Sequence, residues 1–107
     1  MTLWDQVTDV QRDAIVTRLI GAFPGSGVPE HLRPGLVRYF SDGVLPGGFL
    51  RAVLAGDTED AIQRADPESL NGLFALTEFL RAYAPHVAWG SREKVLAWTT
   101  TPERWEG

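Results

Sequence analysis

The stretch ADPESLNGLFALTEFLRAYAP, residues 65–85, contains the clearest helix boundaries in the chain. Asp66 is followed directly by Pro67, which is the order expected of an N-cap residue and the first helical position, where the N–H that proline lacks would have no partner. Pro85 ends the segment, because proline cannot continue a helix. The stretch therefore predicts one helix over residues 67–83.

This predicted helix is apolar on more than one side. Its first apolar stripe consists of Leu70, Leu73, Phe74, Thr77 and Leu80, and its second consists of Leu76, Phe79 and Tyr83. A helix that is apolar nearly all round is usually covered by other elements. We therefore expect it to lie at the centre of the fold.

The rest of the chain shows helical periodicity as well. Apolar residues recur every three or four positions over residues 3–23, although a cap at Thr8 or Asp9 would start this helix later. Further helices are predicted over residues 30–41, 48–55, 57–65 and 91–98, the last with Ser91 as its cap, and no segment alternates in the manner of a strand. The sequence thus predicts an all-α, compact bundle of five or six short helices, in a single domain over residues 1–107 with a tail from about residue 99.

Composition argues against several kinds of chemistry. The chain has no cysteine, which excludes a disulfide, a thiolate zinc site and a cysteine nucleophile. Its 14 acidic residues outnumber its 10 basic ones, and the resulting formal charge of −4 opposes general attraction to nucleic acid. Acids near the N-terminus and the lack of a long apolar run argue against a signal peptide and a membrane span. We expect a cytoplasmic protein without cofactor or metal.

The stretch VLPGGFLRAVLAGD, residues 44–57, contains a glycine pair at the start of a predicted helix. It lacks the lysine and hydroxyl residue of a phosphate-binding P-loop, and no strand precedes it. We expect Gly47 and Gly48 to supply a tight turn that lets the chain enter this helix closely packed, with Phe49 and Leu50 in the core. An anion held at the start of this helix, with Arg51 nearby, is the alternative.

The other groups that suggest catalysis or metal binding are better explained by helix ends. His31 and His86 share no metal-ligand spacing, and we interpret both as surface or capping groups. The acids in residues 57–60 lack calcium-loop spacing and are typical of a first helical turn, which follows Gly56 as the left-handed end of the preceding helix. With no Gly-x-Ser-x-Gly elbow either, the sequence predicts a protein that is not an enzyme.

Three tryptophans stand in the C-terminal part of the chain. Tryptophan is enriched in binding hot spots and also fills the cores of small bundles. We expect Trp89 and Trp98 inside the bundle, and Trp105, which stands in a polar tail, is the leading candidate for a partner contact. The candidate binding residues are Trp105, Trp89, Arg51 and Arg92. The residues given a structural role are Gly47, Gly48, Phe49, Leu50, Asp66, Pro67 and Trp98.

Two blocks of the sequence, LPGGFLRAVLAGDTEDAIQRAD at residues 45–66 and YAPHVAWGSREKVLAW at residues 83–98, carry a resemblance to a known family. The chain resembles a family of small helical proteins of unknown function encoded by bacteriophages and prophages. These share a Pro-Gly-x-Phe-Leu-x-Ala-Val-Leu block, an Arg-Ala-Asp step and a Trp-Gly-Ser turn. The resemblance covers roughly residues 44–98, and it leaves the segment over residues 21–43 without a counterpart. It supplies no catalytic residues to carry over.

The resemblance implies a phage accessory protein that acts inside a bacterial host. In that setting we expect binding to a host or phage protein, for host modulation or counter-defence, and self-association is a further possibility. The alternative is a nucleic-acid-associated role, which requires that folding gather four arginines on one face: Arg33, Arg38, Arg51 and Arg64.

Overall fold

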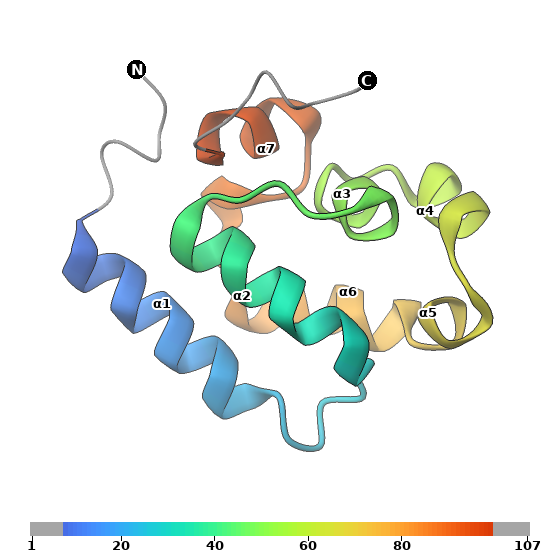
Figure 1. Ribbon diagram of the computed structural model, residues 1–107, viewed down its shortest axis with the longest axis horizontal. Coiled ribbons are helices and arrows are strands. Elements are labelled where there is room, and N and C mark those ends of the chain that lie inside the picture. The colour runs from blue at the N-terminus through green and yellow to red at the C-terminus, as the bar shows by residue number, and fades with distance from the viewer. Residues whose placement is uncertain (1–7, 100–107) are drawn as a thin grey trace.

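The computed structural model describes residues 8–99, which form α-helices and short 3-10 turns and contain no strand (Figure 1). The all-α prediction is confirmed. In chain order the elements are α1 (Asp9–Ala22), η2 (Glu30–Leu32), α2 (Arg33–Asp42), α3 (Gly48–Leu54), α4 (Thr58–Arg64), α5 (Pro67–Asn71), α6 (Leu73–Tyr83), η3 (His86–Ala88) and α7 (Arg92–Trp98).

The molecule is flat, with extents of 37 × 32 × 18 Å. Its shortest extent accommodates two layers of helices, since packed helices lie about 8–10 Å apart. In Figure 1, α1 and α2 run side by side and α6 passes behind α2. Within residues 8–99, no helix combines the length and the apolar character needed to cross a membrane.

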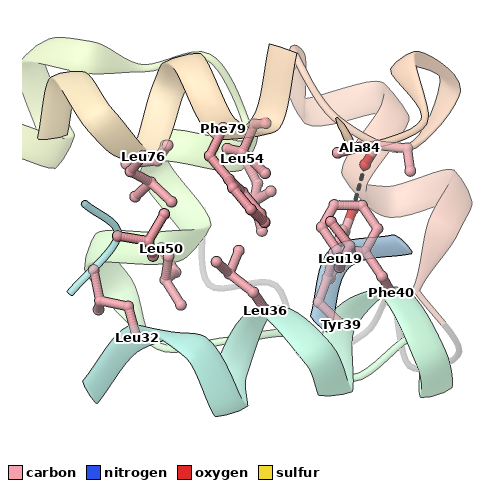
Figure 2. Packing of buried hydrophobic residues seen from close by; sticks show 14 of the residues in the cluster. Leu19, Leu32, Leu36, Tyr39, Phe40, Leu50, Leu54, Leu76, Phe79 and Ala84 are labelled. Atoms are coloured by element: carbon pink, nitrogen blue, oxygen red, sulfur yellow. Dashed lines mark hydrogen bonds between the residues drawn. The ribbon is translucent and has the colours of Figure 1, made fainter. Parts of the chain in front are cut away.

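The core lies between the two layers. Leu36 of α2, Leu54 of α3 and Leu76 of α6 are fully buried and point into the same space (Figure 2). Each such side chain contributes about 1.5–3 kcal/mol through its removal from water. Trp98 of α7 is also buried, as predicted, and its indole Nε1–H donates a hydrogen bond of 2.9 Å to the carbonyl oxygen of Tyr39.

Three predicted helix starts are confirmed by capping hydrogen bonds. At each, a side-chain oxygen accepts the backbone N–H three residues later: Thr8 from Gln11 (3.1 Å), Asp66 from Ser69 (2.7 Å) and Ser91 from Lys94 (3.2 Å). Such a bond satisfies a donor that has no partner within the helix. Pro67 follows Asp66 in the first turn, as predicted.

The prediction of a single helix over residues 67–83 is wrong, because the structure divides this segment into α5 and α6 at Gly72. Gly72 has φ −92° and ψ 1°, outside helical geometry. The ring of Pro29 packs on it so closely that a Cβ atom on Gly72 would lie 2.5 Å from Pro29 Cγ. The helix is therefore divided at a position where Pro29 approaches the backbone so closely that only glycine fits. The helical periodicity of the sequence gives no sign of this contact. It brings the number of α-helices in the described range to seven.

The predicted central position of this segment is also only partly right. Leu76, Phe79 and Leu80 are buried, and Leu73 is partly buried against the core. Phe74, which belongs to the first predicted stripe, has 77% of its surface exposed, and Leu70 is 46% exposed. A helix in an 18 Å layer pair has neighbours on one side, so the side that carries Phe74 faces solvent.

Candidate functional site

Two of the predicted binding residues, Arg51 and Arg92, lie together. They line a hollow of about 350 Å³ between α3 and α4, here called the α3–α4 hollow, together with Arg64, Asp57 and Asp60. The Nε atom of Arg64 donates to both carboxylate oxygens of Asp60, each at 3.0 Å. Folding therefore joins arginines that are distant in sequence, but it places carboxylates among them.

Of the two other predicted binding residues, Trp89 and Trp105, the structure describes only Trp89. Trp89 is partly buried against the core, with its ring edge-on to His86 at a centroid distance of 6.4 Å. Its indole Nε1 is buried without a hydrogen-bond partner among the described residues. Trp105 lies outside residues 8–99, so its role in partner contact stays a prediction.

The glycine pair lines a second hollow of about 380 Å³, here called the glycine-loop hollow, where η2, α2, α3 and α5 meet. His31, Arg38 and Arg64 supply its basic lining. A Cβ atom on Gly48 would lie 2.8 Å from Arg64 Nη1, so the predicted close packing involves only the end of a flexible side chain there. The prediction of close packing is wrong for Gly47, which has an ordinary φ of −68° and no neighbour within 4 Å of a Cβ position.

His31 connects η2 to the start of α5. Its Nδ1 lies 3.2 Å from Glu68 Oε2, and its Nε2 lies 3.0 Å from Ser69 Oγ and 3.7 Å from Asp66 Oδ2. The order serine, histidine, carboxylate is that of a hydrolase triad. Ser69 is only 2% exposed, however, and its N–H and hydroxyl both bond to Asp66, which lowers the pKa of that carboxyl. The cluster surrounds the Asp66 cap of α5, which is compatible with the interpretation of His31 as a surface or capping group.

The structure also contains a groove that the sequence reasoning missed. Three hollows, of about 420, 370 and 360 Å³, follow one another along α1. Tyr83 lines the first two of these hollows, and Ile15 and Pro85 line the last two. We call this continuous surface the α1–α6 groove.

Each wall of the α1–α6 groove has a clear origin in the sequence. The α1 wall is formed by one helical stripe, with spacings of three and four: Gln11, Ala14, Ile15, Arg18 and Ala22. The opposite wall includes Phe74 and Tyr83, which are 77% and 40% exposed. The signal in the sequence was the apolar character of residues 67–83 on more than one side, which predicted a central position for the whole segment.

The charged side chains of the α1–α6 groove favour a positive potential. Arg18 Nη2 donates to the carbonyl oxygen of Ala82 at 3.1 Å, and its guanidinium lies 5.7 Å from the centre of the Tyr83 ring. No carboxylate among residues 8–99 lies within ion-pair distance of Arg18. Arg81 pairs with Glu78, so these two charges offset each other.

Comparison with protein-family models, curated proteins and solved structures gives no match to this chain. What its surfaces do is therefore inferred from their own geometry and charge.

The arginines of the predicted nucleic-acid face are only partly gathered. Arg38 and Arg64 line the glycine-loop hollow, and Arg51 joins Arg64 in the α3–α4 hollow. Arg33 is directed elsewhere: its Nε and Nη2 donate to the carbonyl oxygen of Val28, at 3.1 and 2.9 Å. Among residues 8–99, no group of three or more histidines and carboxylates is arranged to hold a metal ion.

Proposed function

We propose that this protein is a small accessory protein, encoded by a bacteriophage or prophage, that binds a host or phage protein inside the bacterial cell. The binding surface in this proposal is the α1–α6 groove, and its occupant is an acidic amphipathic helix of the partner. The phage setting comes from the sequence resemblance. The surface and its occupant come from the shape and charge of the groove.

The observation that carries the proposal is the exposure of Phe74 within the groove. Phe74 has 77% of its surface in water, so its burial against a partner would contribute about 1.5–3 kcal/mol. It stands beside Tyr83 on a hollow, and aromatic side chains beside hollows are typical anchors of protein interfaces. A single exposed apolar side chain needs no explanation, but one on a continuous groove marks an interaction surface.

The dimensions and charge of the groove favour a helix with carboxylates. The α1 wall runs from Gln11 to Ala22, which is about 17 Å at about 1.5 Å per residue and matches roughly three turns of a partner helix. Apolar side chains of that helix at spacings of three and four would fill successive hollows. A carboxylate on its rim would pair with Arg18, which has no acidic partner in the described chain.

The nucleic-acid alternative has weaker support. Its arginines share their hollow with Asp57 and Asp60, and the whole chain has a charge of −4. Backbone recognition of nucleic acid depends on unopposed positive charge, so these acids reduce the attraction.

The proposal is tested by affinity capture from a nuclease-treated bacterial lysate with tagged wild type, Phe74→Ser and Val10→Ser. Val10 is the matched control, because it is 78% exposed on α1 but does not line the groove. A Trp105→Ala variant tests the predicted C-terminal contact separately. We expect a partner retained by wild type and Val10→Ser and lost with Phe74→Ser.

The captured partner then has to supply the predicted occupant. We expect an acidic helical peptide from it to compete for binding and to bind Phe74→Ser at least about tenfold more weakly than wild type, as for loss of a hot spot. Capture that is insensitive to Phe74→Ser contradicts the groove proposal. A concentration-dependent dimer of wild type that Phe74→Ser abolishes would instead make a second copy of this chain the occupant.

A further inference from the structure

We infer that the glycine-loop hollow binds a phosphate monoester, with Arg38 and Arg64 holding the phosphate beside Gly47. This site goes beyond the proposed function and shares no lining residue with the α1–α6 groove. It also differs from a P-loop, which the glycine stretch does not resemble. The phosphate here is held by side chains of other helices.

The two arginines come from different elements and meet at one hollow. Arg38 stands on α2 and Arg64 ends α4. No carboxylate among residues 8–99 lies within ion-pair distance of Arg38. The bonds of Arg64 to Asp60 use its Nε, whereas its Nη1 lies over Gly48 at the hollow wall. A guanidinium presents paired N–H donors that match two phosphate oxygens, and two guanidinium groups match a dianion.

The carboxylates near the hollow are already engaged by local donors. Asp66 lines the hollow, but it accepts the Ser69 N–H at 2.7 Å and lies 3.7 Å from His31 Nε2. Glu68 lies against His31 Nδ1 at 3.2 Å. Arg38 has no carboxylate within ion-pair distance in the described chain, so an anion in the hollow would pair with it.

Gly47 is the second and independent observation. Its φ of −68° is accessible to any residue, and no atom lies within 4 Å of a Cβ position there. It is the N-cap of α3, where serine or aspartate would stabilise the helix somewhat better. No side chain covers the backbone at Gly47, so a ligand in the hollow can approach it closely.

The remaining wall suits the organic part of a monoester. Leu32, Pro34 and Phe49 line the same hollow and present apolar atoms beside the arginines. A ligand with a phosphate and a short apolar or aromatic group would use both kinds of surface. Phenyl phosphate combines these features and is the probe of choice.

The test is a titration of the full-length, 15N-labelled protein with phenyl phosphate, followed by NMR. We expect saturable shifts of the Gly47 and Gly48 amides at millimolar ligand or below, smaller affinity for inorganic phosphate, and no saturable shift with benzyl alcohol. Arg38→Ala should weaken binding by about tenfold, as expected for loss of a charge-assisted contact. Arg18→Ala, on the α1–α6 groove, should leave phosphate binding unchanged.

Two substitutions of Gly47 separate binding from folding. Gly47→Asp and Gly47→Ser both cap α3, so both should keep or raise the unfolding midpoint. Gly47→Asp also brings a negative charge to the phosphate position and should weaken binding by about tenfold, more than Gly47→Ser does. The inference is overturned if phenyl phosphate gives no saturable shift, if benzyl alcohol binds equally well, or if Gly47→Asp binds like wild type.

Discussion

A Cβ atom on Gly56 would lie only 2.5 Å from the carbonyl oxygen of Gly90. The two glycines therefore allow the end of α3 to contact the loop before α7, where the Gly90 N–H donates to the carbonyl oxygen of Leu54 at 2.6 Å. Gly56 has φ 76°, which confirms the left-handed helix end predicted from the sequence. What the sequence did not indicate is that this helix end is also a tertiary contact.

Gly56→Ala should therefore destabilise the protein more than loss of a helix end alone explains. Gly25 is the matched control, because it has the same φ of 76° but no neighbour within 4 Å of a Cβ position. We expect Gly25→Ala to cost about 1–2 kcal/mol through its left-handed conformation, and Gly56→Ala to cost about 1–3 kcal/mol more through the clash with Gly90. Urea unfolding of the two variants measures the difference, and equal losses would contradict the contact.

Alanine substitutions at Gly21 and Gly72 should have opposite effects. Gly21 lies in α1 with no atom within 4 Å of a Cβ position, so Gly21→Ala should stabilise the protein by about 0.5–1 kcal/mol through helix propensity. At Gly72 the added methyl group would meet Pro29 Cγ at 2.5 Å, and we expect a loss of about 1–3 kcal/mol. Thermal unfolding shows whether each variant is more or less stable than wild type. A higher stability of Gly72→Ala would show that Pro29 does not fix the break between α5 and α6.

Tyr39 should make the folded state sensitive to alkaline pH. Its hydroxyl donates a buried hydrogen bond of 2.6 Å to the carbonyl oxygen of Ala88, and burial raises the pKa of Tyr39 above its ordinary value of 10.0. The unfolded chain ionises first, so the contribution of Tyr39 to stability is constant below pH 10.0 and falls above it, on the order of 1 kcal/mol per pH unit.

Tyr39→Phe provides the control for this pH dependence. At neutral pH it should cost about 1–3 kcal/mol, because Ala88 loses a buried donor. Above pH 10.0 its free energy of unfolding should fall less steeply than that of wild type. Parallel curves for the two proteins would mean that Tyr39 ionises in the folded state.

Asp66 should contribute stability that acid removes. Hydrogen bonds from Ser69 lower the pKa of Asp66 from its ordinary value of 3.8, so the stabilisation is complete above that pH and is lost as the pH falls through the lowered pKa. Asp66→Ala should lower the thermal midpoint at neutral pH, and its difference from wild type should shrink in acid. Val10→Ser, a change at an exposed position of α1 without a titratable group, should show no such convergence; a constant difference at Asp66 would contradict the charged cap.

The helix starts were predictable because a cap depends on a few neighbouring residues. Asp66 followed by Pro67 indicates a helix start by itself, and Thr8 is a residue type that caps helices. The break at Gly72 was missed because its cause, Pro29, is far away in sequence. Phe74 was assigned to the core for the same reason: periodicity shows that a side of a helix is apolar, but not whether another helix covers it.

The sequence by itself determined the helical class, the starts of most helices and the burial of Trp98, because these follow from local backbone chemistry and from apolar spacing. The tertiary structure alone decided which side chains share a surface. It placed Phe74 on the α1–α6 groove, and it placed Arg38, Arg64 and Gly47 on one hollow, since the directions in which separate helices pack depend on contacts between residues distant in the chain.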